Sequence, residues 1–128
     1  MKELIHNPTE GIYPATPDYV HALEVRQPER WLYIAGTMGL ESDGSAPGSL
    51  EQQLELIWRN IRTILAHADM TVDNIVRITS YLRDPSFAAA NGAARERALG
   101  GRRVPTTAIV AQTLVPEWLV EIEAIALA

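Results

Sequence analysis

The chain has 128 residues, of which 47% are hydrophobic and 21% charged, and its formal net charge is −5. These values fit a single globular domain over residues 1–128. The surplus of carboxylates argues against binding to a phosphate backbone, so no nucleic-acid partner is expected. The lack of cysteine excludes disulfides and thiolate chemistry. No apolar run is long enough to cross a membrane and no signal peptide is recognisable, which predicts a cytoplasmic protein without membrane contact.

Short extended segments are predicted in the first third of the chain. One strand is expected over Glu3–His6. Alternating side chains predict a second over Asp18–Val25, and β-forming residues predict a third over Trp31–Thr37. Only a polar turn separates the second and third strands, so we expect them to pair as a hairpin.

A helix is predicted after the loop that ends at Gly48. Ser49 is a favourable N-cap, and the helix should end near His67 and Ala68. Helical spacing relates the apolar residues Leu54, Ile57, Trp58, Ile61 and Leu65. This stripe predicts one face that packs on a core.

The next segments alternate strand and helix. A strand is predicted over Ile75–Leu82. Strict alternation places Ile75, Arg77, Thr79 and Tyr81 together on one of its faces. A second helix should start with Asp84 as N-cap and Pro85 at its first position, and end before Gly100.

Two further strands complete the predicted order. They are expected over Thr106–Leu114 and Val120–Ala126. The resulting order, β-β-β-α-β-α-β-β, predicts a two-layer α+β domain in which both helices cover one face of a mixed sheet. The other face would carry Tyr19, His21, Thr79, Tyr81, Ile125 and Leu127. This mixture is too apolar for water and too polar for a core, which favours self-association with pockets at the seams.

The last strand carries two carboxylates on the face opposite its core residues. Glu121 and Glu123 share this face with Ile125. A carboxylate in a partly dry cleft can act on a bound water as acid or base, while a purely structural role for Glu121 is equally compatible with the pattern. Glu123 is expected to form an ion pair, with Arg77 as one candidate partner.

Several separate residues carry a family resemblance. They are Tyr19, Ala22, Gly36, Gln53, Asn60, the run Ile75–Asp84, Asn91, Pro105 and the closing run Glu121–Ala126. In order and spacing they resemble the Rid family (reactive-intermediate deaminases, also called YjgF-type proteins) over nearly the whole chain. The resemblance implies a chorismate-mutase-like homotrimer with three clefts, each built from two subunits.

The resemblance also implies a chemistry. Family members that hydrolyse imines and enamines to ketones and ammonia use an arginine in a Pro-x-Arg motif to grip a substrate carboxylate, and the first glutamate of the closing motif positions a water. Here Glu121 is retained, but Thr107 stands at the arginine position and Ala35 replaces the serine before Gly36. This departure predicts a small-molecule substrate without that carboxylate, or a cleft without catalysis.

We therefore expect Glu121 and Thr107 to be the catalytic pair. The expected substrate-binding residues are Tyr19, His21, Ala35, Gly36, Asn91, Thr106 and Trp118. Each has an ordinary structural alternative, such as a β-forming threonine, an asparagine that ties down its helix, or a tryptophan that anchors an interface. No metal-ligand spacing occurs, and no cofactor is expected.

These residues predict a Rid-type hydrolase or deaminase that acts on an imine, an enamine or a related labile intermediate. The first alternative is a non-catalytic trimer that binds a metabolite. The second is an endoribonuclease or translation inhibitor, which the acidic balance disfavours.

Overall fold

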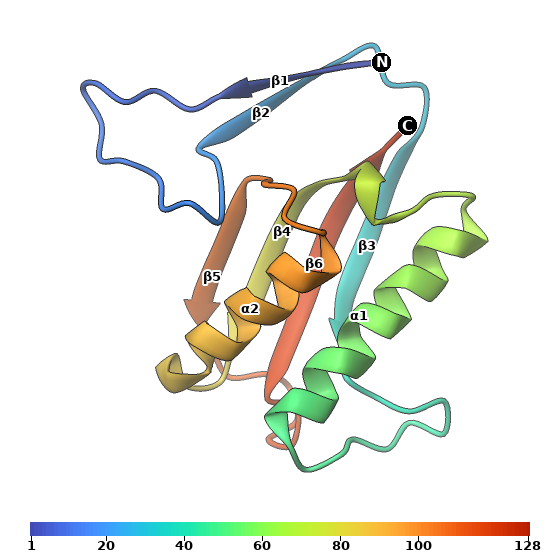
Figure 1. Cartoon of the computed structure of the whole chain (residues 1–128). Helices are drawn as coiled ribbons and strands as arrows, with labels where there is room; N and C mark the ends of the chain where they lie inside the picture. Colours follow the sequence, from blue (N-terminus) through green and yellow to red (C-terminus); the bar gives the residue numbers. More distant parts are fainter.

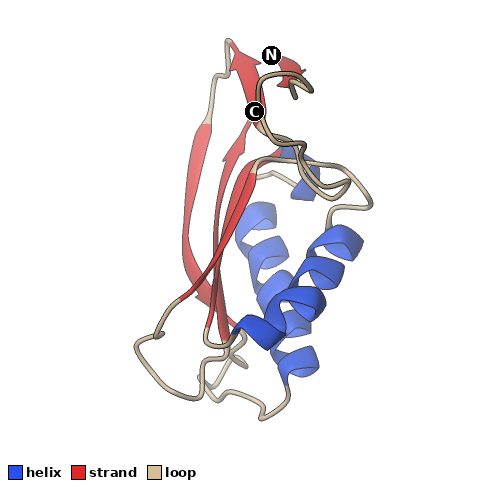
Figure 2. Ribbon diagram, turned by 90° about the vertical axis from the view of Figure 1, so that its left-hand side faces the viewer, coloured by secondary structure: helices blue, strands red, loops and turns tan.

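Two helices cover one face of a four-stranded sheet in the computed structural model, which describes residues 1–128 (Figure 1). The strands are β1 (Lys2–His6), β2 (Ala22–Arg26), β3 (Trp31–Met38), β4 (Ile75–Leu82), β5 (Thr106–Val110) and β6 (Val120–Leu127); the helices are α1 (Leu50–His67) and α2 (Ala88–Ala98). Figure 2 shows both helices on the same side of the sheet, while its other side is bare. The predicted two-layer α+β class is confirmed.

The main sheet has the strand order β3-β6-β4-β5. β6 pairs antiparallel with both β3 and β4, whereas β4 and β5 pair parallel and are joined through α2. The C-terminal strand therefore lies inside the sheet, with a neighbour on each side. Backbone hydrogen bonds hold β6 on both sides, so the Cα positions of its bare-face residues are fixed, which suits a site that needs fixed geometry.

Both predicted helices are confirmed, and so is the Ser49 cap of the first, whereas α2 starts at Ala88, later than predicted, with Phe87 as an N-cap that makes no side-chain hydrogen bond. Ser49 accepts a hydrogen bond from the backbone N–H of Gln52 at 3.1 Å and begins α1. Asp84 caps a short 3₁₀ turn over Pro85–Phe87, which leads into α2. Gly100 and Gly101 follow α2 with φ of 61° and 83°, a conformation that glycine adopts without strain. Neither helix is long and apolar enough to cross a membrane.

The core lies between the helices and the sheet. It contains 18 buried residues, among them Ile57, Ile61 and Leu65 of α1 and Ile78 of β4. One predicted orientation is wrong: Ile75 does not share a face with Arg77 but is fully buried in this core. The pairing of β4 with β6 shifts register between Ile75 and Arg77. This irregularity turns Ile75 inward and leaves Arg77 on the bare face.

The predicted hairpin between the second and third strands is wrong. β2 pairs antiparallel with β1 in a separate two-stranded sheet, and β3 pairs only with β6. The backbone N–H groups of Glu29 and Arg30 both donate to the carbonyl of Ala128 at 2.8 Å. These bonds draw the chain to the end of β6 before β3 begins, so β3 extends along β6 and not along β2. We call residues 2–26 the N-terminal arm.

Two predicted strands are shorter in the structure. Residues 18–21 are not part of a strand: the Tyr19 N–H donates to the Thr16 carbonyl at 3.4 Å, and β2 starts only at Ala22. β5 ends at Val110, and not at Leu114 as predicted. β5 lies at the edge of the sheet and pairs only with β4, which ends at Leu82, so later residues have no strand to pair with.

A buried glutamine connects α1 to the entrance of β6. The Gln53 side chain is 2% exposed and its amide donates to the carbonyls of Pro47 and Glu117, both at 2.8 Å. Its oxygen accepts from the Leu119 N–H at 2.9 Å. With every polar atom satisfied, this side chain fixes the chain just before Glu121.

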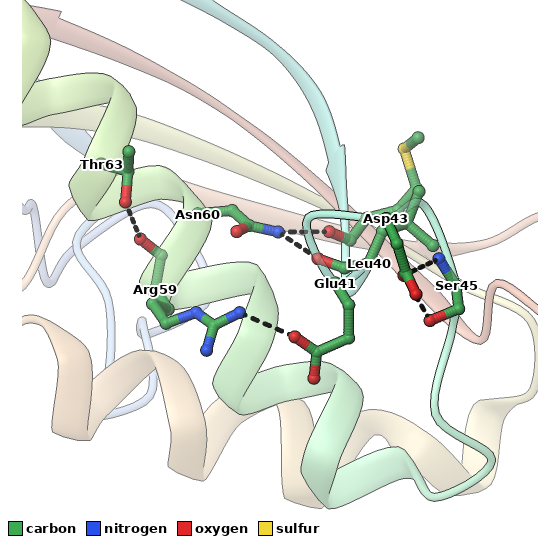
Figure 3. A network of polar contacts seen from close by, with 8 residues as sticks. Leu40, Glu41, Asp43, Ser45, Arg59, Asn60 and Thr63 are labelled. Atoms are coloured by element: carbon green, nitrogen blue, oxygen red, sulfur yellow. Dashed lines mark hydrogen bonds and ion pairs between the residues drawn. The ribbon is translucent and has the colours of Figure 1, made fainter.

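A second side chain of α1 holds the exit of β3 (Figure 3). Asn60 donates to the carbonyls of Met38 at 3.2 Å and Leu40 at 3.0 Å. Arg59 reaches the following loop through Glu41 at 3.1 Å. α1 thus anchors both the segment that enters β6 and the segment that leaves β3, which lie at the end of the sheet that carries Glu121.

Candidate functional site on the bare sheet face

The bare face of the sheet is built around alternate residues of β6. The buried residues of this strand that face the helices are Val120, Ile122, Ala124 and Ala126. Glu121, Glu123 and Ile125 alternate with them and are only half-buried. The period of two in the sequence therefore produces a sheet that is apolar toward the helices and carries two carboxylates on its open face.

Glu121 lies against a glycine of the neighbouring strand. A Cβ atom at Gly36 would fall 2.1 Å from Oε2 of Glu121, so only glycine leaves room for this carboxylate position. The carboxylate makes no hydrogen bond to another side chain, and it borders a hollow of about 330 Å³. The lining residues are Tyr81, Ala111, Gln112, Thr113, Leu114, Glu121 and Glu123. The Glu121 carboxylate therefore packs against Gly36 and is accessible to a ligand or water from the hollow.

Replacing Gly36 with alanine is expected to displace the Glu121 carboxylate without unfolding the protein. The added methyl group meets the far end of a flexible side chain, which can rotate away. We expect the free energy of unfolding to change by less than about 1 kcal/mol, while any activity that depends on Glu121 falls roughly tenfold or more.

Denaturant unfolding and a rate assay on the same preparation measure both quantities. Gly48→Ala is a matched control, because nothing lies within 4 Å of its added Cβ. Equal activity in the Gly36→Ala and Gly48→Ala variants would contradict a role for the Glu121 position.

Glu123 is engaged by a phenol on β4. The Tyr81 hydroxyl donates to Oε1 of Glu123 at 2.6 Å, and this bond is the main reason that the pKa of Tyr81 is raised. The expected ion pair between Glu123 and Arg77 is not formed. Instead, Arg77 donates from Nη2 to the Thr107 hydroxyl of β5 at 2.7 Å. Of the two carboxylates, Glu121 is the one left without a side-chain partner.

A second, larger hollow lies on the other side of Glu123. It measures about 500 Å³ and is open to solvent. Its lining residues are Tyr33, Ile34, Ala35, Arg77, Thr79, Glu123, Ala124 and Ile125. The structure therefore brings the predicted residues Ala35, Gly36 and Glu121 to one face, in and between two adjoining hollows, with Thr107 reached through Arg77.

Two predicted residues lie elsewhere in the same subunit. Tyr19 and His21 belong to the N-terminal arm, where the His21 ring lies edge-on to Tyr13 and Tyr19 with ring centroids 5.1 and 5.9 Å apart. The arm sits at the end of the sheet where β6 finishes, whereas Glu121 is near the start of β6 (Figure 1). Within one chain these aromatic groups do not share a hollow with Glu121.

Three other predicted residues lie outside both hollows. Asn91 is 1% exposed in α2, on the helix side of the sheet, and its Oδ1 has no hydrogen-bond partner. The Thr106 hydroxyl donates to the Val104 carbonyl at 3.1 Å. Trp118 lies in the turn before β6, where its carbonyl accepts from a threonine hydroxyl at 2.7 Å. None of the three lines either hollow.

Four residues that were not among the predicted site residues also line the hollows. Tyr33, Arg77 and Thr79 line the larger one, and Tyr81 lines the smaller one. Thr79 and Tyr81 pair in register with Glu123 and Glu121. Strand pairing was the missing information, because residues directly opposite in neighbouring strands share a face. Nowhere do three histidine, cysteine, aspartate or glutamate side chains gather as a possible metal site.

Most of the chain is similar to proteins of a known family. A family model described as endoribonuclease L-PSP matches residues 11–128. A relative from Pyrococcus horikoshii, the RutC family protein PH0854, is 27% identical over 128 residues, which cover 98% of each chain. The Escherichia coli RutC family protein YjgH is 35% identical over 54 residues, which span 42% of this chain and only 41% of YjgH.

Solved structures extend the likeness to the fold. The Rid-family protein YyfB from Yersinia pestis superimposes with a TM-score of 0.85 at 31% identity, and the match covers 100% of both chains. RidA from an Antarctic Psychrobacter species gives a TM-score of 0.74 at 23% identity over 95% of this chain. The second likeness is one of fold alone, whereas the first joins fold and sequence over the full length.

Proposed function

This chain belongs to the Rid (YjgF) family, and from that membership and the open sheet face we propose that it is a small-molecule hydrolase that releases ammonia from an imine, an enamine or a related labile intermediate. Glu121 carries the proposal. It is a half-buried carboxylate without a side-chain partner, seated on Gly36 and bordering a hollow. A carboxylate so placed can accept a proton from water.

In the proposed reaction, water adds to the carbon of the C=N bond while Glu121 accepts one of its protons. Starting from the protonated imine, this step gives a neutral carbinolamine. Glu121 then returns its proton to the nitrogen, the C–N bond breaks with release of ammonia, and the hydroxyl proton passes to Glu121 and on to solvent, which leaves the carbonyl group. Water and imine are consumed and ketone and ammonia are formed, so no further reactant is needed. Because such intermediates already hydrolyse in water, one positioned base and a shaped pocket are sufficient for useful acceleration.

We further propose that a neighbouring copy of the chain covers this face, as the family resemblance implies for a homotrimer. Trp31, Tyr33 and Ile109 are 58%, 70% and 48% exposed, and strand register places them on the bare face. Large apolar side chains around two carboxylates are typical of a surface that another protein covers. A neighbour could also bring its own Tyr19 and His21 to Glu121.

The test is ammonia release from a panel of freshly generated imines and enamines, with carboxylate-bearing and neutral members, measured against the spontaneous rate. We expect acceleration of at least one member at protein concentrations well below that of the substrate. If no member is accelerated, the hydrolase proposal fails and a non-catalytic metabolite-binding role, which the loss of the arginine at position 107 favours, takes its place.

A ribonuclease role suits the charge of the molecule poorly. The net charge is −5, and the bare face carries the carboxylates of Glu121 and Glu123, which would repel a phosphate backbone. RNA binding that weakens steeply with salt would support that role, and we expect none at physiological ionic strength.

A further inference from the structure

Arg77 presents a guanidinium group on the bare face without an acidic partner. It is half-buried, lines the larger hollow and takes part in none of the ion pairs of the protein. The Arg77 side chain makes one hydrogen bond, from Nη2 to the hydroxyl of Thr107. A guanidinium carries five N–H donors, so most of them remain available to a ligand.

Ordinary strand alternation places Arg77 on the bare face, in one continuous register with Thr79 and Tyr81. The register shift between Ile75 and Arg77 buries Ile75 in the core and leaves Arg77 on the opposite face. The shift thus removes Ile75 from the bare face, and Arg77 is the first β4 side chain on it. The Thr107 hydroxyl on the neighbouring strand then fixes the far end of the side chain.

The threonine at position 107, where related proteins have an arginine, leaves room for Arg77. An arginine at position 107 would compete with Arg77 for the same space and would repel it. With threonine there, the guanidinium arrives from β4, and the neutral hydroxyl orients it without neutralising its charge.

The hollow contains charges of both signs. Arg77 and Glu123 both line it, yet they do not form an ion pair, and Glu123 is held by Tyr81. A carboxylate is attracted by the guanidinium of Arg77, at whichever end of the ligand it lies. A small molecule with a carboxylate at one end and a protonated nitrogen at the other satisfies both groups at once.

We propose that Arg77, positioned by Thr107, binds the carboxylate of the substrate, and that the nitrogen end of the substrate points toward Glu123 and Glu121. The inference rests on the proposed function and specifies its substrate class as an imine or enamine that bears a carboxylate. The threonine at position 107, taken alone, predicts a substrate without a carboxylate, and the position of Arg77 reverses that prediction.

Binding of a product analogue tests this assignment without relying on catalysis. Pyruvate carries the carboxylate and pyruvamide is its neutral counterpart, and calorimetry can measure the dissociation constant of each for the full chain. For pyruvate we expect a loss of affinity of about tenfold or more in Arg77→Gln, since one charge-assisted pair is removed. Arg77→Lys should retain part of the affinity, and pyruvamide binding should not change in either variant.

Thr107→Val provides a second variant that keeps the guanidinium but removes its hydroxyl partner. We expect it to weaken pyruvate binding by a smaller factor than Arg77→Gln, with circular dichroism and oligomeric state unchanged. Equal pyruvate affinity in wild type and Arg77→Gln, equal losses for pyruvate and pyruvamide, or no pyruvate binding by wild type would each overturn the assignment. Arg77-dependent binding without ammonia release would leave the assignment intact and count against the proposed hydrolase.

Discussion

Replacing Glu121 with glutamine is expected to lower the rate constant for ammonia release by about 100-fold or more, because general-base catalysis typically contributes that much. Glutamine matches glutamate in size and fits the same space against Gly36, but its amide cannot accept a proton from water. The fold should be unaffected, since the Glu121 carboxylate takes part in no ion pair and bonds to no side chain. Initial rates on the best substrate of the imine panel measure the effect.

Glu123→Gln makes the same change two residues along the same face, and it separates a carboxylate proposed to lie near the substrate nitrogen from the one proposed to transfer a proton. Glu123 accepts the Tyr81 hydroxyl at 2.6 Å, and an amide oxygen can still accept that bond. We expect less than about a tenfold loss of rate. Equal rates for wild type and Glu121→Gln, or a greater loss in the Glu123 variant, would assign the proton transfer to a different group.

Replacing Gly39 with alanine is expected to give the largest loss of stability, about 3 kcal/mol or more in the free energy of unfolding. Its added Cβ would lie 2.3 Å from the carbonyl oxygen and 2.6 Å from the Cα of Gln53. These are backbone atoms of α1, so relief requires the whole helix to move. The displacement would also disturb the Gln53 side chain, which holds the entrance to β6.

Gly92→Ala is the matched control for this substitution. Gly92 lies inside α2, and nothing lies within 4 Å of its added Cβ. Alanine in a helix interior is favoured over glycine by roughly 0.5–1 kcal/mol, so this variant should be slightly stabilised. Denaturant unfolding at one fixed protein concentration compares the two. A loss below about 1 kcal/mol for Gly39→Ala would show that α1 is not held as tightly as its contacts indicate.

Local patterns predicted most of the fold because their causes are local. The Ser49 cap and the apolar stripe of α1 are short-range features, and both are present in the structure. The period of two in β6 likewise follows from strand geometry alone. By contrast, the hairpin was predicted from proximity in sequence, whereas the real partner of β2 is β1. Strand pairing depends on contacts between residues far apart in the sequence. Here the hydrogen bonds from Glu29 and Arg30 to the Ala128 carbonyl place β3 beside β6.

The candidate site shows the same division. Glu121 could be selected from the pattern of its own strand. The contact between Glu121 and Gly36, the bond from Tyr81 to Glu123 and the reach of Arg77 all join different strands. None of these contacts has a signature along the chain, because each depends on the register between strands.

That the site joins Glu121 of one subunit to Tyr19 and His21 of the next can be tested directly by measuring ammonia release from mixed oligomers. One component carries Glu121→Gln, and the other carries Tyr19→Phe with His21→Ala. If both residue sets form one shared cleft, each component alone is slow, and random mixing restores both sets in about a quarter of the clefts. Activity well above the sum of the two components is the predicted result. A mixture no faster than that sum, or a fully active arm variant, would contradict a site shared between subunits.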